Sequence, residues 1–187
     1  GAGLPSIGDS QQLFVLNGLS KLEENGKMAI IQNGSAMFTG DAASGSSEIR
    51  RYFLETHDWL ETIIQLPNDS FMNTGISTYI WIFNKNKAKA RKDKVQLIDA
   101  TSIKSPLRKN LGEKNCETNE ADRKKILDLL MDFKENEYSK IFPNEEFGYW
   151  EVELFKPAKD EDGNVIKDKK GRVKMAKVKG EVEQIPF

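Results

Sequence analysis

Apolar residues recur at helical spacing near the start of the chain. A helix is therefore expected from Asp9 or Ser10 to about Asn25, where Asn25-Gly26 ends the pattern. Its apolar positions are Leu13, Phe14, Leu16, Leu19 and Leu22. The run Lys27–Gln32 has a continuous apolar centre and predicts a strand buried on both faces of a sheet. A helix leading into a buried strand indicates an α/β layer.

A long loop is expected from Asn33 to Gly45, because this segment is rich in Gly, Ser, Ala and Asn. Open α/β sheets place their ligands at the carboxyl ends of strands, so a functional site is expected near this loop. Ser46 or Ser47 is then expected to cap a second helix that extends to about His57.

Two segments rich in β-branched and aromatic residues follow, Leu60–Leu66 and Ile76–Phe83, and they predict an antiparallel hairpin around the loop Pro67–Gly75. Residues 84–94 contain six Lys or Arg, and this basic run is either a solvated connection or one that faces phosphates. Val95–Asp99 predicts a further strand.

The remainder divides into a polar stretch, a helix and a tail. The helix is expected from Thr118 or Asn119 to about Phe133, with one apolar side. The tail, 147–187, has alternating apolar residues and the turn signals Asp162-Gly163 and Lys170-Gly171, so it predicts a mobile β-ribbon outside the core. The pattern thus divides the chain into 1–100, a helical extension 101–146 and a β-ribbon tail 147–187.

Charge and residue counts exclude several classes of function. The 28 basic and 29 acidic residues nearly cancel, which argues against a freestanding nucleic-acid binder. One cysteine and one histidine cannot form an internal disulfide or a His/Cys zinc cluster, so no metal and a cytoplasmic, reducing location are expected. No apolar run is long enough to cross a membrane.

Individual reactive residues give no support to an enzyme. His57 lies at a helix end, and no G-x-S-x-G elbow accompanies it, so hydrolase chemistry is not expected. Cys116 lies in a polar stretch and is expected to be an exposed, incidental thiol. Gly40–Gly45 lacks the lysine of a phosphate-binding loop. The chain enters its first helix almost at once, which favours a fragment of a longer protein.

Several short motifs occur in a fixed order along the chain. They are Gly26–Gly34, Phe38–Asp41, Ser47–Arg51, Trp59–Pro67, Phe71–Ile76 and Lys94–Ala100. From about Leu4 to Tyr149 this series resembles the modification subunits of type I restriction-modification systems, which methylate the exocyclic amine of adenine in DNA with S-adenosylmethionine. The order and spacing together carry the resemblance, because any one motif alone is weak.

The resemblance implies a fold and an incomplete active site. Residues 1–100 would be the C-terminal part of a Rossmann-like α/β catalytic domain, its last three strands with helices, with Ile76–Phe83 antiparallel between its two neighbours. The donor-binding glycine motif and the Asn-Pro-Pro-aromatic tetrapeptide of the family are absent, and all six prolines are isolated. S-adenosylmethionine is therefore expected in the full-length protein but not on this fragment, which should be inactive alone.

The resemblance also assigns residues to the target-base side of the site. Phe71 holds the family position for an aromatic that stacks on the flipped adenine, and the alternative is a loop aromatic folded into the core. Asn33, Gly34 and Gly75 are expected to line the same cleft, although turn chemistry explains Asn33 and Gly34 nearly as well. The basic residues that could contact phosphates, or else only solvent, are Arg50, Arg51, Lys85 and Arg91.

The expected partners are DNA, a specificity subunit and a restriction subunit, with self-association of the fragment and no membrane. Two other functions remain open. One is a non-catalytic α/β module that binds protein or DNA, and the other is the tail of a different Rossmann-like enzyme. An upstream glycine-rich motif followed by Asn-Pro-Pro-aromatic would favour the methyltransferase.

Overall fold

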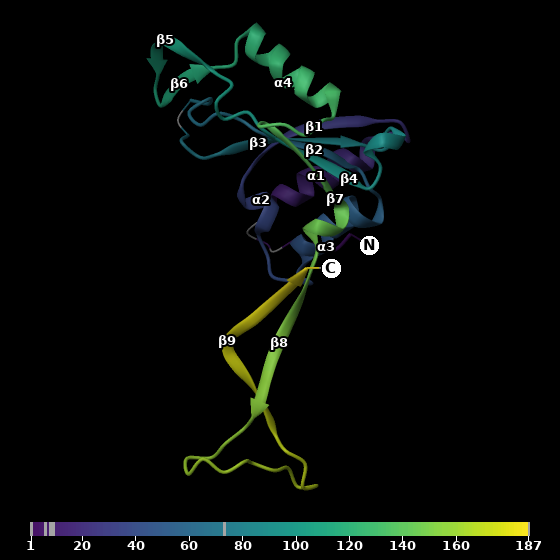
Figure 1. Cartoon of the computed structure of the whole chain (residues 1–187), viewed down its shortest axis with the longest axis vertical. Coiled ribbons are helices and arrows are strands. Elements are labelled where there is room, and N and C mark those ends of the chain that lie inside the picture. Colours follow the sequence, from purple (N-terminus) through teal and green to yellow (C-terminus); the bar gives the residue numbers. More distant parts are fainter. Residues whose placement is uncertain (1, 6, 8–9, 73, 187) are drawn as a thin grey trace. The chain divides into compact units, whose positions relative to one another are not determined.

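The structure is a computed structural model that describes residues 2–5, 7, 10–72 and 74–186 (Figure 1). It contains two compact units, Gly1–Asn144 and Glu145–Phe187, and each is described by itself. None of the described helices has the length and apolar character needed to cross a membrane.

The first unit is built on a mixed five-stranded sheet. Its strands, in spatial order, are β1 (Lys27–Asn33), β3 (Thr78–Asn84), β2 (Leu60–Gln65), β4 (Lys94–Asp99) and β7 (Ser139–Pro143). β3 is antiparallel to both β1 and β2, β2 is parallel to β4, and β4 is antiparallel to β7. The expectation that Ile76–Phe83 lies antiparallel between two strands is confirmed. The fold is mixed α/β.

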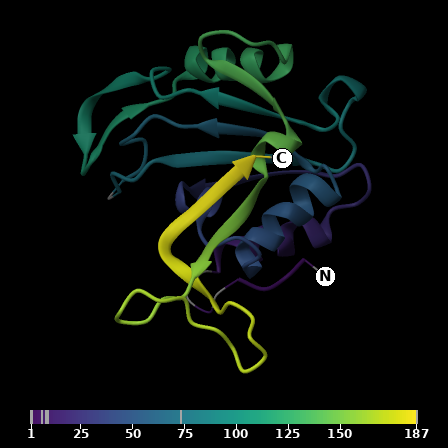
Figure 2. The same ribbon diagram turned by 60° about the horizontal axis from the view of Figure 1, so that its bottom comes forward.

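Helices cover both faces of this sheet (Figures 1 and 2). On one side lie α1 (Gln11–Lys21), α2 (Ser35–Phe38) and α3 (Gly45–Arg51), which continues as the π-helix η1 (Tyr52–Thr56). On the other side lies α4 (Glu120–Asp132), whose predicted start is confirmed because Asn119 forms a capping box with Asp122. The 3₁₀ turn η2 (Lys89–Arg91) precedes β4.

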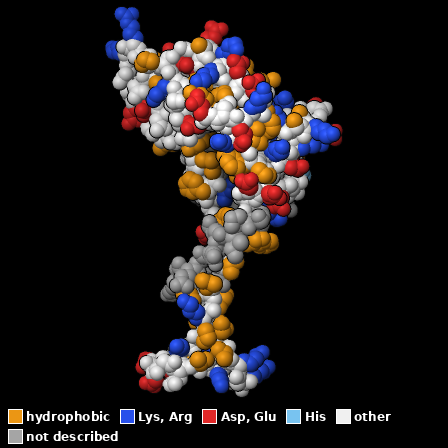
Figure 3. All heavy atoms as spheres, in the orientation of Figure 1, with side chains coloured by type: hydrophobic (Ala, Val, Ile, Leu, Met, Phe, Trp, Pro, Cys, Tyr) orange, Lys and Arg blue, Asp and Glu red, His pale blue; other side chains and the backbone are white. Residues whose placement is uncertain are grey.

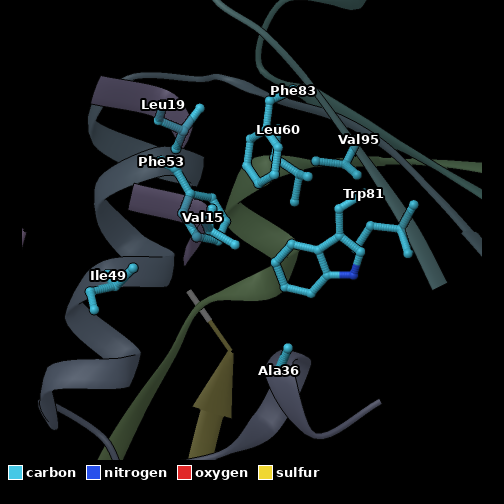
Figure 4. Packing of buried hydrophobic residues seen from close by; sticks show 10 residues of the cluster. Val15, Leu19, Ala36, Ile49, Phe53, Leu60, Trp81, Phe83 and Val95 are labelled. Atoms are coloured by element: carbon cyan, nitrogen blue, oxygen red, sulfur yellow. The ribbon is translucent and has the colours of Figure 1, made fainter. Parts of the chain in front are cut away.

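The main hydrophobic core lies between the sheet and the α1–α3 side (Figure 4). Trp81 and Phe83 point from β3 to this side because residues two apart share a face of a strand. Phe53 of η1 packs edge-on against both rings, at centroid distances of 5.9 and 5.2 Å. Val15 and Leu19 of α1 complete the contact. A smaller cluster containing Ile64, Ile98, Ala100 and Ile103 packs under α4.

Three expectations for the N-terminal half are wrong. The segment expected as a loop from Asn33 to Gly45 contains the helix α2. β1 is not buried on both faces: it pairs with β3 at the border of the described sheet, and the side chain of Ile31 is 53% exposed. The second helix begins earlier than expected, because Ser44 is the N-cap and accepts a hydrogen bond from the backbone N–H of Ser47 at 3.4 Å. Ser46 is instead buried inside the helix.

The polar stretch before α4 also differs from its expected form. It contains a hairpin of β5 (Ser105–Leu111) and β6 (Lys114–Glu117), with Gly112 at φ 63° in the turn. β7 follows α4 and joins the main sheet beside β4. Residues 101–146 thus hold a hairpin and a sheet strand in addition to the predicted helix.

The second unit is a β-ribbon, and the mobility expected of the tail stays a prediction. β8 (Tyr149–Pro157) follows the turn η3 (Asn144–Phe147) and pairs antiparallel with β9 (Met175–Pro186). Apolar side chains are exposed along its described part (Figure 3), and Trp150 and Phe155 are 65% and 52% exposed. The unit therefore consists of a paired backbone with exposed apolar side chains among its charged ones.

We expect the 187-residue chain to self-associate through β1. The described residues leave one side of this strand without a backbone partner, and an uncovered apolar strand is a template for pairing with another chain. Light scattering over a concentration series should detect the association, and Ile31→Lys should weaken it by placing a charge on the strand. A monomer at high concentration, with Met28–Ile31 amides unprotected from hydrogen exchange, would contradict this expectation.

Candidate functional site

The carboxyl end of the sheet gathers the expected cleft residues. β1, β2 and β4 all end there, and β3 begins there, because Asn33 pairs with Thr78 and the N–H of Leu66 donates to the carbonyl of Thr78 at 2.9 Å. The loop after β1, which starts with Gly34, therefore meets the loop between β2 and β3, which carries Phe71 and Gly75. Residues more than thirty positions apart in sequence reach one end of the sheet.

Asn33 has a local structural task at this end. Its Oδ1 accepts hydrogen bonds from the backbone N–H and the hydroxyl of Ser35, at 3.1 and 2.6 Å. These bonds fix the turn from β1 into α2 through Gly34, where a Cβ would lie 3.4 Å from the ring of Tyr79. The turn chemistry is thus observed, and a cleft-lining role for the two residues stays a prediction.

The loop between β2 and β3 presents Phe71 to the surface. Phe71 is 36% exposed and belongs to neither hydrophobic cluster. The loop around it is ordered by its own hydrogen bonds, since Ser70 Oγ donates to the carbonyl of Pro67 at 2.7 Å and Ser77 Oγ donates to Asn68 Oδ1 at 3.1 Å. A Cβ at Gly75 would meet only Asp69 Oδ1, at 3.9 Å. Asn73, also in this loop, lies outside the described residues.

The β5–β6 hairpin supports this loop from the side, which no sequence pattern indicated. The backbone N–H of Asn115 donates to the carbonyl of Asp69 and its Nδ2 to Asp69 Oδ2, both at 3.2 Å. Cys116 Sγ donates to the carbonyl of Asn68, also at 3.2 Å. The expectation of an exposed thiol is wrong, because Cys116 is 1% exposed and packs between hairpin and loop.

The two arginines of α3 interact within the chain. Arg50 Nη1 donates to the carbonyl of Thr39 at 2.8 Å, which ties the helix to the loop after α2. Arg51 forms an ion pair with Glu48 at 2.6 Å, and this pair raises the pKa of Arg51. A phosphate contact by either residue stays a prediction and would require the side chain to exchange or share its partner.

Lys85 and Arg91 lie at the opposite end of the sheet from Phe71. They follow β3, whose 7 residues span roughly 20 Å at about 3.3 Å per residue. Lys85 Nζ donates to the carbonyl of Leu22 at 2.8 Å and lies over the ring of Trp59. Arg91 is held by Glu61 and the backbone of α4. Phosphate contacts there stay predictions, and they would be remote from Phe71.

The amino end of the sheet, where Lys85 and Arg91 lie, also holds a buried ion pair. Lys87 Nζ, on a side chain that is 1% exposed, lies 2.5 Å from Asp58 Oδ1 and donates to the carbonyl of Lys94 at 2.9 Å. Asp58 also accepts from Asn144 Nδ2 and from the backbone N–H of Asp93, both at 2.8 Å. Burial lowers the pKa of Lys87, and the hydrogen bond that Lys87 donates to Asp58 opposes that shift. The network joins the segment before β2, the connection from β3 to β4, and the residue after β7.

His57 belongs to the structure of this end of the sheet. It is the C-cap of η1, as expected of a helix-end residue, and its ring stacks on that of Trp59 at 4.1 Å. The described residues contain no cluster of three or more His, Cys, Asp or Glu that could hold a metal ion.

The hollows and several exposed apolar side chains lie at opposite ends of the sheet. Two hollows of about 320 Å³ each lie at the amino end, where both border Lys85. Trp59 lines one of them and His57 lines the other. The carboxyl end instead presents exposed side chains, among them Phe38, Phe71 and Met72. Binding of S-adenosylmethionine by other parts of a longer chain stays a prediction.

The chain is similar in sequence to methylase subunits of type I restriction enzymes. The chain is 32% identical over 101 residues to the methylase subunit of the type I restriction enzyme HindI from Haemophilus influenzae, covering 54% of this chain and 22% of that protein. It is 29% identical over 124 residues to the MpnII methylase subunit from Mycoplasma pneumoniae, covering 65% and 20%. The chain thus spans about a fifth of the length of these relatives.

A solved structure shares the fold. The methyltransferase subunit of a type I restriction-modification system from Streptococcus thermophilus superposes with a TM-score of 0.62 and 27% identity, over 74% of this chain and 27% of that one. The family model for the N-6 DNA methylases matches residues 2–154, which is most of the chain. With the sheet order and the loops at its carboxyl end, this match shows that the chain belongs to the N-6 DNA methylase family.

Proposed function

We propose that this chain is the target-base side of the active site in an adenine-N6 methyltransferase subunit of a type I restriction-modification complex. The observation that carries the proposal is the meeting of the β1 and β2–β3 loops at the carboxyl end, with Phe71 exposed on an ordered loop. Open α/β sheets bind ligands at this end. Family membership supplies the reaction class.

The role proposed for these residues is to hold a base, not to transfer the methyl group. An enzyme that modifies a base inside a duplex extrudes it and holds it by stacking against flat side chains. Phe71 would stack on the adenine, and Asn33, Gly34 and Gly75 would border it. The rest of a full-length chain would bind S-adenosylmethionine, which supplies the methyl group. In this proposal, the C-terminal part of a Rossmann-like domain lies in residues 1–100.

The proposed partners follow from the same relatives. The matched relatives are methylase subunits of type I restriction enzymes. We therefore propose that the partners, beside DNA, are a DNA-specificity subunit and a restriction subunit. A separate subunit that reads the sequence is compatible with the near-zero net charge of this chain, −1 at pH 7.

We expect the complete subunit with its specificity subunit to transfer a labelled methyl group from S-adenosylmethionine to adenine N6 in duplex DNA. The 187 residues alone should show no measurable donor affinity in titration calorimetry, because they lack the glycine-rich and Asn-Pro-Pro motifs. The complete chain is the matched control. Micromolar donor binding by the 187 residues would place the donor site here, and an inactive complete complex would reject the proposed function.

A further inference from the structure

The β5–β6 hairpin is fixed at both sides of its base. On one side, Cys116 and Asn115 bind the loop that carries Phe71. On the other side, Ser105 Oγ donates to Asp122 Oδ2 at 2.9 Å and accepts from Asn119 Nδ2 at 2.7 Å, which ties the hairpin to the start of α4. An element held in this way keeps a constant position relative to Phe71.

The hairpin and the residue before it carry more basic than acidic side chains. Lys104, Arg108 and Lys109 are exposed and Lys114 is half-buried, against the acidic Glu113 and Glu117. Lys and Arg side chains project at the end of the first unit where β5 and β6 lie (Figure 3). The pairing register shifts between Pro106 and Leu111, so Arg108 and Lys109 stand on an irregular stretch of β5. Such irregularities recur beside active sites, where they redirect side chains.

These cations differ from the other basic residues near the sheet. Within the described part of the chain, Arg108 and Lys109 form no salt bridge or side-chain hydrogen bond, whereas Arg51, Lys85 and Arg91 each have a partner in the same chain. A cation without a partner in the protein can neutralise an external anion without breaking an internal contact. The hairpin therefore offers free positive charge next to the loop of Phe71.

We propose that the β5–β6 hairpin binds the DNA backbone beside the flipped adenine through Arg108 and Lys109. This inference rests on the proposed function, since it assumes that Phe71 faces a base. Extruding a nucleotide rotates its backbone, so the neighbouring phosphates need to be held near the pocket. Phosphate contacts position a protein on the duplex without reading its sequence. Such a contact suits a complex in which a separate subunit recognises the DNA sequence.

The test is the salt dependence of DNA binding by the complete subunit with its specificity subunit. The variant carries Arg108→Gln and Lys109→Gln, and the matched control carries Lys89→Gln and Lys92→Gln, two exposed lysines at the amino end of the sheet. Each lost phosphate contact reduces the slope of log affinity against log salt by about 0.9. We therefore expect the hairpin variant to lose about 1.8 in slope, equally for cognate and unrelated duplexes, and the control to lose none.

Either of two outcomes would overturn the inference: an unchanged slope in the hairpin variant, or an equal loss in both variants, which would mean a general effect of net charge. Protection of the Cys116 thiol from alkylation verifies that the hairpin is still docked. If the parent complex does not methylate adenine, the proposed function fails, whereas normal methylation with an unchanged slope removes only the hairpin contact.

A second measurement reports how close the hairpin lies to the DNA backbone, and not how affinity depends on charge. Lys109→Cys in the complete complex should undergo thiol–disulfide exchange with a duplex that carries an activated mixed disulfide on the phosphate next to the target adenine. The exchange links the protein to the duplex and releases the small thiol. Lys89→Cys, at the other end of the sheet, is the control and should not react. Equal crosslinking of both variants, or none by Lys109→Cys, would reject a backbone contact by the hairpin.

Discussion

Phe71→Ala is expected to slow adenine methylation by roughly 5- to 150-fold in the complete subunit bound to its specificity subunit. The substitution removes a base–aromatic stacking interaction worth on the order of 1–3 kcal/mol, and each 1.4 kcal/mol corresponds to about tenfold in rate. Phe71→Trp keeps a flat ring and should retain activity. Single-turnover methylation of a cognate duplex measures the effect.

The controls separate stacking from packing. Because Phe71 is 36% exposed and outside both hydrophobic clusters, its removal should leave donor affinity and thermal stability nearly unchanged. Phe14→Ala removes another exposed phenylalanine, on α1, and should not alter the rate. A core phenylalanine would lose about 3–5 kcal/mol of stability on truncation. A Phe71→Ala variant that melts far earlier while its folded fraction methylates normally would therefore reject the stacking role.

Asp58→Asn should destabilise the first unit by about 3–5 kcal/mol at neutral pH, the range for removing one partner of a buried ion pair. The change leaves the ammonium of Lys87, on a side chain that is 1% exposed, without its negative partner. Asparagine tolerates the left-handed backbone that Asp58 adopts, at φ 52°, so the loss reports the charge and not backbone strain. Urea unfolding curves of the variant and the parent chain give the difference.

The pH dependence provides an independent check. Burial lowers the pKa of Lys87 in the folded state below its ordinary value of 10.5, so between the two values the unfolded chain binds more protons. Stability from this group therefore rises with pH across that window. Asp58→Asn lowers the folded-state pKa further, and part of its deficit should recover as the pH approaches about 10.

A matched exposed pair sets the scale for this measurement. Asp128→Asn breaks the contact with Lys124, whose side chain is 72% exposed, and should cost less than about 1 kcal/mol. An equal effect of Asp58→Asn and Asp128→Asn, or no recovery of Asp58→Asn at high pH, would mean that the Lys87–Asp58 pair is not a buried charge pair in solution.

The main elements of the first unit follow from local sequence patterns. Trp81 and Phe83 alternate with less buried positions in β3, and this period of two fixes which side chains enter the core. Asn119 and Asp122 set the start of α4 through contacts three residues apart. Such signals depend on neighbours along the chain, so they can be recognised without knowledge of the fold.

The resemblance to a family added what periodicity does not contain. It placed Ile76–Phe83 between two strands, an order that the hydrogen bonds confirm. It also singled out Phe71, for which spacing alone left a core position and a surface position equally open. The surface position observed here depends on the conformation of the β2–β3 loop. Hydrogen bonds from Ser70 to Pro67 and from Ser77 to Asn68 hold that conformation.

The sequence by itself determined α1, α3, α4 and the strands β1 to β4, because each depends on residue type or short-range spacing. Tertiary structure alone decided that Cys116 is buried, that β5 and β6 pair, and that Lys85 and Arg91 lie far from Phe71. These facts depend on contacts between distant positions, such as Cys116 with Asn68, whose free energy does not enter any local pattern. The β5–β6 hairpin was missed for this reason: its strands are polar, and only docking on the loop of Phe71 fixes its place.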